Sequence, residues 1–385
     1  MSHRPMDALR ASVPFLRWMQ TSRYVARQHD PGIADFMFGN PHDMPIPAYV
    51  AELARSVVPR DRSWFAYKMS EPPATAVVAR TLSERTGLEW DPADVFMTNG
   101  GFAAIAVALR TLCGPGDEVV FLSPPWFFYE LLVLAAGAKP VRVPIAPPRF
   151  DLPVAAIAAA VGPKTRAVLV NSPHNPSGRV WSRADFEALA SALAARSAEI
   201  GHPVWILSDE AYAKVVFDGR AAASPAAVYP HTVVLYSYGK QLLAPGQRVG
   251  YAAVPPTAPG REELREDMTM AQCATGFAFP NALLQHALPD IERLSIDLAA
   301  LQARRDRFVP AVRAAGFEAT MPEGTFYVLV RAKDGDDAAL VDRLADRGVF
   351  VLPGAIVELP GWVRVSLTAN DAMVDQGIQA FRELG

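Results

Sequence analysis

One lysine in this chain stands among residue types that support covalent chemistry. Lysine is scarce, with six among the 37 Lys and Arg residues. Lys240 follows a strand-like apolar run, with Ser237 three residues before it and Arg248 eight residues after it. Desolvation and a nearby cation make an amine nucleophilic, and the three groups together would suit a phosphate-bearing cofactor. Taken alone, the pattern also fits a surface lysine in a loop. Four other lysines are expected in exposed loops: Lys68, Lys139, Lys164 and Lys333. Whether Lys214 lies in a loop or takes part in a site stays open.

Polar loops follow two other strand-like runs. The segment Asn171 to Gly178 comes after the apolar run 166–170, and Asp209 to Tyr212 comes after the run 204–207. In open sheets of parallel strands, ligands bind at the carboxyl ends of the strands. Two acids after a buried strand are costly unless one of them pairs with a cation, and a protonated heterocyclic nitrogen is one such cation.

Two further strand ends supply an anion site and a planar ring. Gly100 and Gly101 join the run 95–98 to a helix, where backbone N–H groups approach anions, although two glycines are more often a simple turn. Trp126 lies in an aromatic run that could stack on a planar cofactor, although such runs are usually core. Together, the strand ends combine an anion site, a stacking ring, a carboxylate and an amine.

The elements that must position these residues alternate between β-rich and helical runs. Continuous apolar runs such as 167–170 are typical of strands covered on both faces. We therefore predict an α/β fold in which a large domain has a mostly parallel central sheet flanked by helices, followed by a smaller α+β domain. Strands are expected at 95–98, 118–122, 140–143, 166–170, 204–207, 232–236, 249–254, 326–330, 349–352 and 363–367, and helices at 47–58, 71–86, 102–112, 127–136, 183–197, 260–271, 280–315, 336–347 and 371–384.

With these motifs in this order, the chain resembles the class I/II aminotransferases, which are fold-type I enzymes dependent on pyridoxal 5'-phosphate (PLP). The resemblance implies that Lys240 forms the internal aldimine with PLP and later shuttles a proton. It implies that Asp209 pairs with the pyridine nitrogen and that Trp126 stacks on the ring. Asn175 and Tyr212 would donate hydrogen bonds to the 3-oxygen of the ring.

The resemblance also implies a phosphate site, and the sequence departs from the family's pattern there at two positions. Phe102 stands where relatives often have a polar side chain, so only its backbone N–H could help, and Gly239 replaces a second serine. Phosphate binding then depends more on Ser237 and Arg248. The implied site consists of Ser237, Arg248, the helix start at Gly100, Gly101 and Phe102, and Tyr67 of the partner subunit in a homodimer with shared active sites.

For the substrate, the resemblance implies that Arg364 binds the α-carboxylate and that Gly39 lines the same pocket. The predicted function is a ping-pong transfer of an amino group between an L-amino acid and a 2-oxo acid. The side chain of the amino acid stays open. A second cation for a dicarboxylic substrate is conceivable at Arg17, Arg23 or Lys68.

Aromatic clusters offer the opposite specificity, a pocket for an apolar side chain. They occur at Phe15 and Trp18, at Trp126 to Tyr129, and at Phe277 and Phe279, and core packing is the alternative for most of them. Two other functions remain open. One is a PLP-dependent β-eliminating lyase or synthase, which uses the same residues. The other is a regulatory protein, for which the segment before Gly39 is too short to hold a DNA-binding domain.

Composition excludes several classes of protein. The chain has 385 residues, of which 51% are hydrophobic, so disorder is excluded, and a net charge of −3 without a basic block argues against nucleic-acid binding. Cys113 and Cys273 are expected in the core, and no metal site is expected. No apolar run reaches the roughly 18–20 residues of a membrane span, and no signal peptide is evident, so a cytoplasmic location without a membrane partner is predicted.

The length and the order of elements predict a division into domains. Residues 1–46 would form an N-terminal arm and part of the small domain. Residues 47–284 would form the large PLP-binding domain, and residues 285–385 the small C-terminal domain.

Overall fold

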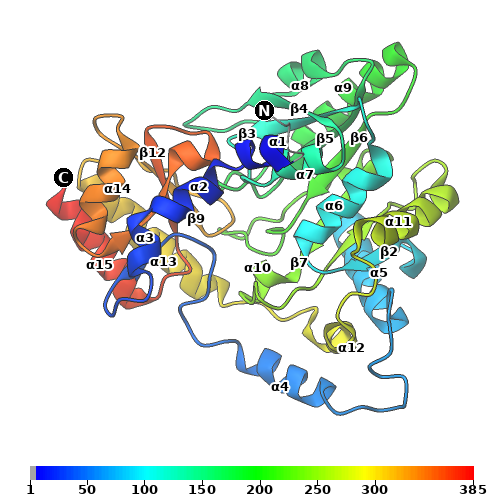
Figure 1. The fold of residues 1–385 in the computed structure, drawn as a ribbon, viewed down its shortest axis with the longest axis horizontal. Coiled ribbons are helices and arrows are strands. Elements are labelled where there is room, and N and C mark those ends of the chain that lie inside the picture. The colour runs from blue at the N-terminus through cyan, green and yellow to red at the C-terminus, as the bar shows by residue number, and fades with distance from the viewer. Residues whose placement is uncertain (1–5) are drawn as a thin grey trace.

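The computed structural model describes residues 6–385, and its centre is a seven-stranded sheet (Figure 1). Neighbouring strands are parallel except at β8, which runs antiparallel to both β2 and β7. The strands β5, β6 and β7 are almost wholly buried, as their apolar runs predict. In spatial order the strands are β2 (Val95–Thr98), β8 (Gly250–Ala253), β7 (Thr232–Ser237), β6 (Trp205–Asp209), β5 (Thr165–Asn171), β3 (Glu118–Ser123) and β4 (Lys139–Pro144).

Helices flank this sheet, and local signals in the sequence set their ends. The helix α5 (Pro72–Thr86) has proline in its first turn and ends at Gly87, whose φ of 75° suits glycine. The helix α9 (Arg183–Ile200) begins with a capping box between Ser182 and Asp185. The remaining helices of this region are α4 (Pro47–Ser56), α6 (Gly101–Leu112), α7 (Tyr129–Ala135), α8 (Val154–Ala160), α10 (Tyr238–Gln241), α11 (Arg261–Thr275) and α12 (Ala282–Ile291).

A smaller region at the C-terminal end contains a three-stranded antiparallel sheet and three helices. Its fully buried core includes Phe308, Val328, Val363 and Phe381. A separate parallel pair of short strands, β1 and β10, joins the N-terminal segment to this region. The domain boundaries at residues 46 and 284 remain a proposal. The elements are β11 (Leu352–Pro353), β12 (Trp362–Ser366), β9 (Tyr327–Arg331), β1 (Ala34–Asp35), β10 (Val349–Phe350), α13 (Leu298–Ala314), α14 (Asp337–Ala345) and α15 (Asp371–Glu383).

The N-terminal arm, whose sequence shows little periodicity, contains three short helices. They are α1 (Met6–Ala11), α2 (Pro14–Thr21) and α3 (Arg23–Arg27), and Figure 1 shows α2 and α3 in blue beside the orange and red C-terminal elements. Arg23 Nη2 donates to Asp346 Oδ1 at 2.8 Å, and this ion pair helps to fix α3 to the C-terminal region. The part of the predicted arm before residue 6 lies outside the described residues.

Two predicted elements are interrupted in the structure. The helix expected over 280–315 is two helices, because the N–H of Ile296 donates to the carbonyl of Gln241 and the side chain of Asp297 caps α13. The strand expected over 349–352 is divided between two sheets, since Val349 pairs with Ala34 and Leu352 pairs with Arg364. Both breaks depend on distant partners, which periodicity cannot reveal.

The two cysteines differ in burial, against the expectation that both lie in the core. Cys113 is buried, whereas Cys273 is exposed because it lies on the outer face of α11. Within residues 6–385, no group of three or more metal-ligating side chains comes together. None of the helices in that part of the chain is long and apolar enough to cross a membrane.

Candidate active site

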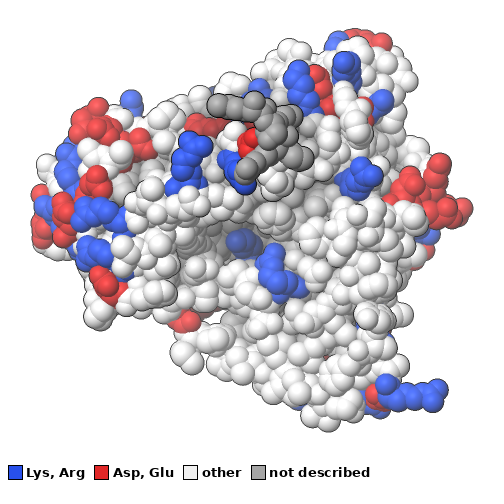
Figure 2. Space-filling model, in the orientation of Figure 1, with Lys and Arg blue, Asp and Glu red and all other residues white. Residues whose placement is uncertain are grey.

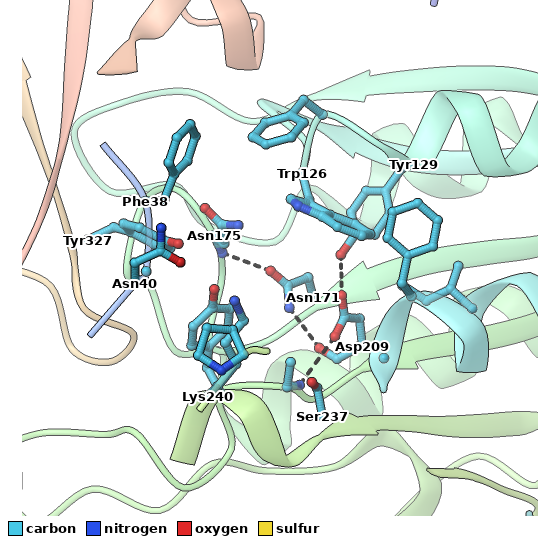
Figure 3. Close-up of a pocket in the computed structure, with 18 of the residues that line it drawn as sticks. Phe38, Asn40, Trp126, Tyr129, Asn171, Asn175, Asp209, Ser237, Lys240 and Tyr327 are labelled. Carbon is cyan, nitrogen blue, oxygen red and sulfur yellow. Dashed lines mark hydrogen bonds between the residues drawn. The ribbon is translucent and has the colours of Figure 1, made fainter. Parts of the chain in front are cut away.

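A pocket lies between the carboxyl ends of β5, β6 and β7 and the C-terminal three-stranded sheet. Figure 2 shows a hollow on this face of the molecule, with basic side chains inside it and a mostly uncharged surface around it. In Figure 3, Lys240 and Ser237 lie on one side of the pocket, with Trp126 and Tyr129 across from them. Several strand ends therefore meet at one cavity, as the predicted order of strands and helices implies.

A buried carboxylate and an amine face this pocket from neighbouring strands. Asp209 is the last residue of β6, and Lys240 lies on α10, directly after β7. Tyr129 donates from Oη to Asp209 Oδ2 at 2.6 Å, and the N–H of Ala211 donates to Oδ1 at 3.2 Å (Figure 3). Burial raises the pKa of Asp209, while these two hydrogen bonds act in the opposite direction. A protonated ring nitrogen in the pocket would give this carboxylate a charged partner.

The loop after β5 is held by its own asparagines. Asn171 donates from Nδ2 to the carbonyl of Asp209 at 2.8 Å, and its Oδ1 accepts from the N–H of Asn175 at the same distance. Asn175 Oδ1 accepts from Arg364 Nη1 at 3.1 Å. The side chain of Asn175 is thus fixed between the sheet of seven strands and the C-terminal region, beside the pocket.

A helix N-terminus, a hydroxyl and a guanidinium come together where β2 leads into α6. Gly100 has a φ of 83°, and a Cβ atom there would lie 2.7 Å from Arg248 Nη2. A Cβ atom at Gly101, the first residue of α6, would lie 3.1 Å from the Cβ of Ser237. Among the described residues, no carboxylate lies within ion-pair distance of Arg248. The two glycines therefore leave room at a helix N-terminus beside a hydroxyl and an unpaired guanidinium, which suits a phosphate.

Arg364 supplies a second, separate cation. Its guanidinium is buried, lies 4.0 Å above the ring centroid of Tyr327, and donates from Nη2 to the carbonyl of Met37 at 3.1 Å. Its Nε finds no partner among the described residues. Burial raises the pKa of the Tyr327 phenol, but the charges of Arg364 and Lys240 outweigh it and lower the pKa overall. A guanidinium that is fixed in this way and still has an N–H group without a partner suits a carboxylate ligand.

Comparison with known proteins identifies the family. The model for aminotransferase class I and II matches residues 34–381. The chain belongs to the class I and II aminotransferase family. It is 30% identical over 354 residues to the aspartate/prephenate aminotransferase of Thermus thermophilus, covering 89% of each chain. It is 32% identical over 291 residues to an arginine–pyruvate transaminase of Pseudomonas aeruginosa, covering 72% of this chain and 70% of that one.

Solved structures agree. An aminotransferase from Eubacterium rectale superposes with a TM-score of 0.88 at 28% identity, covering 100% of this chain and 96% of the other. The predicted fold class is thereby confirmed, as are the predicted aminotransferase activity and the dependence on PLP. The substrates are an amino acid and an oxo acid. None of these matches supports the elimination alternative.

The residues of the pocket fit PLP. The cradle at Gly100 and Gly101 beside Ser237 and Arg248 accommodates a phosphate, because any larger side chain at either glycine would fill that space. At the other side of the pocket, Asp209 is a buried anion without a basic partner at ion-pair distance in the described chain. PLP carries a phosphate and a basic ring nitrogen, so both features find a partner in one ligand.

The pocket gathers most of the predicted site residues of this aminotransferase. Gly100 lies just behind it, against Arg248. Tyr67 does not reach it, since its side chain is 87% exposed and packs on Phe279, with the ring centroids 5.0 Å apart. The predicted residues that line the pocket are Gly39, Gly101, Phe102, Trp126, Asn175, Asp209, Tyr212, Ser237, Lys240, Arg248 and Arg364.

Two other lysines are paired with acids, which favours Lys240 as the reactive lysine. Lys214 is not free, because its Nζ donates to Glu292 Oε1 at 2.8 Å. Lys68 was expected in an exposed loop, but it is half-buried, and its Nζ lies 3.2 Å from Glu71 Oε1. The ion pair with Glu71, three residues further along the chain, holds the Lys68 side chain against the protein surface.

Sequence reasoning assigned no site role to nine residues that line this pocket. Tyr129 appeared only as part of an aromatic run, and its hydrogen bond to Asp209 depends on the packing of α7 over the sheet. Asn171 is the last residue of β5 and the first of the polar stretch 171–178, and this position was the available signal for its side chain. Phe127 lies in the same aromatic run as Tyr129, and no local signal marks the remaining residues. These residues are Phe38, Asn40, Ile105, Phe127, Tyr129, Asn171, Ala211, Pro245 and Tyr327.

Proposed function

We propose that Lys240 is the residue that holds PLP in this aminotransferase and that moves the proton during transfer of the amino group. PLP supplies an aldehyde carbon for an amine and a ring that accepts electrons. Lys240 is the only lysine that lines the pocket among the described residues, and Lys214, the other candidate, is engaged by Glu292. This placement is the observation that carries the proposal.

The other roles follow from the polar groups around Lys240. Asp209 would keep the ring nitrogen protonated, and Tyr129 and the N–H of Ala211 would hold that carboxylate in place. Trp126 would cover one face of the ring. Asn175 and Tyr212 would orient the 3-oxygen, so the ring is fixed before substrate arrives.

The phosphate of PLP and the carboxylate of the substrate would bind to different cationic side chains. Ser237, Arg248 and the backbone N–H groups of Gly101 and Phe102 would bind the phosphate. Arg364 would bind the α-carboxylate of the amino acid, supported by its contacts with Asn175 and the carbonyl of Met37. Gly39 would leave room for this, because a Cβ atom there would lie 2.5 Å from the ring of the fully buried Phe326.

We also propose a homodimer in which Tyr67 completes the phosphate site of the partner subunit. In its own chain Tyr67 is far more exposed than an aromatic side chain usually is. Phe279, which packs on Tyr67, and other large apolar side chains within residues 57–65 are exposed as well, which is typical of a surface that another chain covers. These are Val57 at 55%, Val58 at 65%, Phe65 at 60% and Phe279 at 50% exposure. A cytoplasmic location stays a prediction.

The test is a half-reaction followed by absorbance. Purified enzyme with bound PLP should absorb at roughly 420 nm and lose that band when an amino donor is added without an acceptor. Lys240→Ala should abolish turnover, whereas Lys164→Ala, at an exposed turn, should not alter it. Undiminished turnover by Lys240→Ala, or a protein that never takes up PLP, would contradict the proposal. Release of ammonia in place of a new amino acid would instead favour the eliminating lyase.

A further inference from the structure

One wall of the pocket is aromatic, and it is built from three separate segments. Phe38 follows β1, Phe127 follows β3, and both line the pocket. Phe15, on α2, stacks on Phe127 with ring centroids 4.4 Å apart and meets Phe38 edge to face at 5.7 Å. We call these three residues the aromatic wall. Figure 3 shows Phe38 across the pocket from Trp126.

The aromatic wall is not simply core. Its three rings are half-buried, whereas the core residues that they pack against, such as Met37 and Leu352, are fully buried. The exposed faces of Phe38 and Phe127 belong to the pocket. An apolar surface that is open to a pocket gains most from a ligand that covers it.

Charged groups are absent from this side of the pocket in the described chain. The lining cations are Lys240, Arg248 and Arg364, and the roles proposed above occupy all three. The acid that lines the pocket, Asp209, lies at the opposite side with Tyr129.

The three basic residues that the sequence offers for a dicarboxylic substrate do not line the pocket. Arg23 pairs with Asp346 and Lys68 with Glu71, and Arg17 is exposed and does not line the pocket. A distal carboxylate of the substrate would therefore lose its hydration at the aromatic wall without gaining an ion pair from the described residues of its own subunit. The same holds for a distal guanidinium or ammonium, because no acid lines that side.

We infer that the preferred amino donor carries an aromatic or large apolar side chain, which packs against Phe38 and Phe127 beneath Phe15. The inference rests on the proposed function, because it places the α-carboxylate of the donor at Arg364 and its amine at the PLP held by Lys240. It assigns specificity to residues of the N-terminal segment and of the loop after β3.

The N-terminal segment is held firmly enough to act as a specificity element. Tyr24 donates from Oη to the buried Asp35 at 2.9 Å, and Arg27 donates from Nη1 to the carbonyl of Ala345 at 3.0 Å. Phe15, on the preceding helix, is thus held against the pocket-lining Phe38 and Phe127 before substrate binds. A surface formed in advance loses less entropy on binding.

The experiment compares donors in the half-reaction of the PLP-loaded enzyme. We expect kcat/KM for L-phenylalanine to exceed that for L-alanine by about 10- to 100-fold, as burial of a large apolar side chain predicts. L-aspartate and L-arginine should react more slowly than L-phenylalanine. Phe15→Ala and Phe127→Ala should each lower the phenylalanine-to-alanine ratio of kcat/KM by roughly 10-fold, through a larger loss with L-phenylalanine than with L-alanine.

Leu16→Ala is the matched control, because Leu16 lies next to Phe15 on α2 but is 49% exposed. This variant should keep the parental ratio. A preference for L-aspartate or L-arginine, or an unchanged ratio in both phenylalanine variants, would overturn the inference and leave the aminotransferase function intact. If no amino acid bleaches the band of the loaded enzyme, the proposed function fails instead.

Discussion

The two sides of the pocket are built by different means. The cofactor floor, which we define as Asp209, Ser237, Lys240 and Arg248, is polar and lies at or beside the ends of adjacent strands. The aromatic wall is apolar, half-buried and assembled from loops and an N-terminal helix. Charged and hydrogen-bonded groups act only in a narrow geometry, whereas apolar contact depends mainly on area. The comparison implies that the floor sets the reaction and the wall sets the donor.

The largest effect should come from Asp209→Asn, which removes the charge of the floor and keeps its shape. We expect kcat/KM to fall by about 100- to 1,000-fold, because the ring nitrogen would lose the partner that keeps it protonated. The fall should be the same for L-phenylalanine and L-alanine when steady-state rates are measured. Asp290→Asn, at an exposed position on α12, serves as the control. A donor-dependent loss would break the distinction between floor and wall.

Arg364→Lys should give the next largest effect. Lysine keeps the charge but loses the fork that binds a carboxylate with two hydrogen bonds and that rests on Tyr327. We expect kcat/KM to fall by about 10- to 100-fold, mostly through a higher KM for the amino acid. Arg110→Lys, on the exposed face of α6, should change nothing. An unchanged KM would show that the α-carboxylate binds elsewhere.

Tyr129→Phe should have a smaller effect that depends on pH. Burial raises the pKa of Asp209, and the hydrogen bond from Tyr129 lowers it, so removing the phenol raises the pKa further. More of Asp209 is then protonated at a given acidic pH, and the acid limb of the kcat/KM profile should move to higher pH. The free energy of unfolding should fall by about 1–3 kcal/mol, because a buried carboxylate oxygen loses its donor. A limb that stays in place would show that Tyr129 serves packing alone.

The smallest effect concerns the cysteines, which lie outside both sides of the pocket. Burial raises the pKa of the Cys113 thiol to about 12, so only about one molecule in 10,000 carries the thiolate at pH 8. Cys273 is exposed. A colorimetric thiol reagent should therefore modify one cysteine in the folded enzyme and two after denaturation, with no loss of activity in the first case. Loss of activity on modification of Cys273 would contradict this separation from the site.

The floor could be predicted from sequence, whereas the aromatic clusters at Phe15 and at Trp126 to Tyr129 could be named but not assigned to the pocket, for a physical reason. Lys240, Ser237 and Arg248 lie in one short stretch, and Asp209 directly follows an apolar run, so each carries a local signal. Phe15, whose segment shows little periodicity, meets the pocket-lining Phe38 and Phe127 only through contacts between distant parts of the chain. The same limit hid the hydrogen bond from Tyr129 to Asp209 and the break near Ile296, while the order of strands and helices was predictable from local patterns.

The antiparallel strand β8 has a consequence for how this enzyme is made. It lies between β2 and β7, so Gly100, after the first strand of the sheet, meets Arg248, just before the last one. During translation Gly100 is synthesised long before Arg248. In the interval, the growing chain contains only part of the proposed anion site. With the proposed phosphate site, capture of PLP would then be a late event of synthesis, and a chain that ends before residue 248 would keep Asp209 and Lys240 but lack a complete phosphate site.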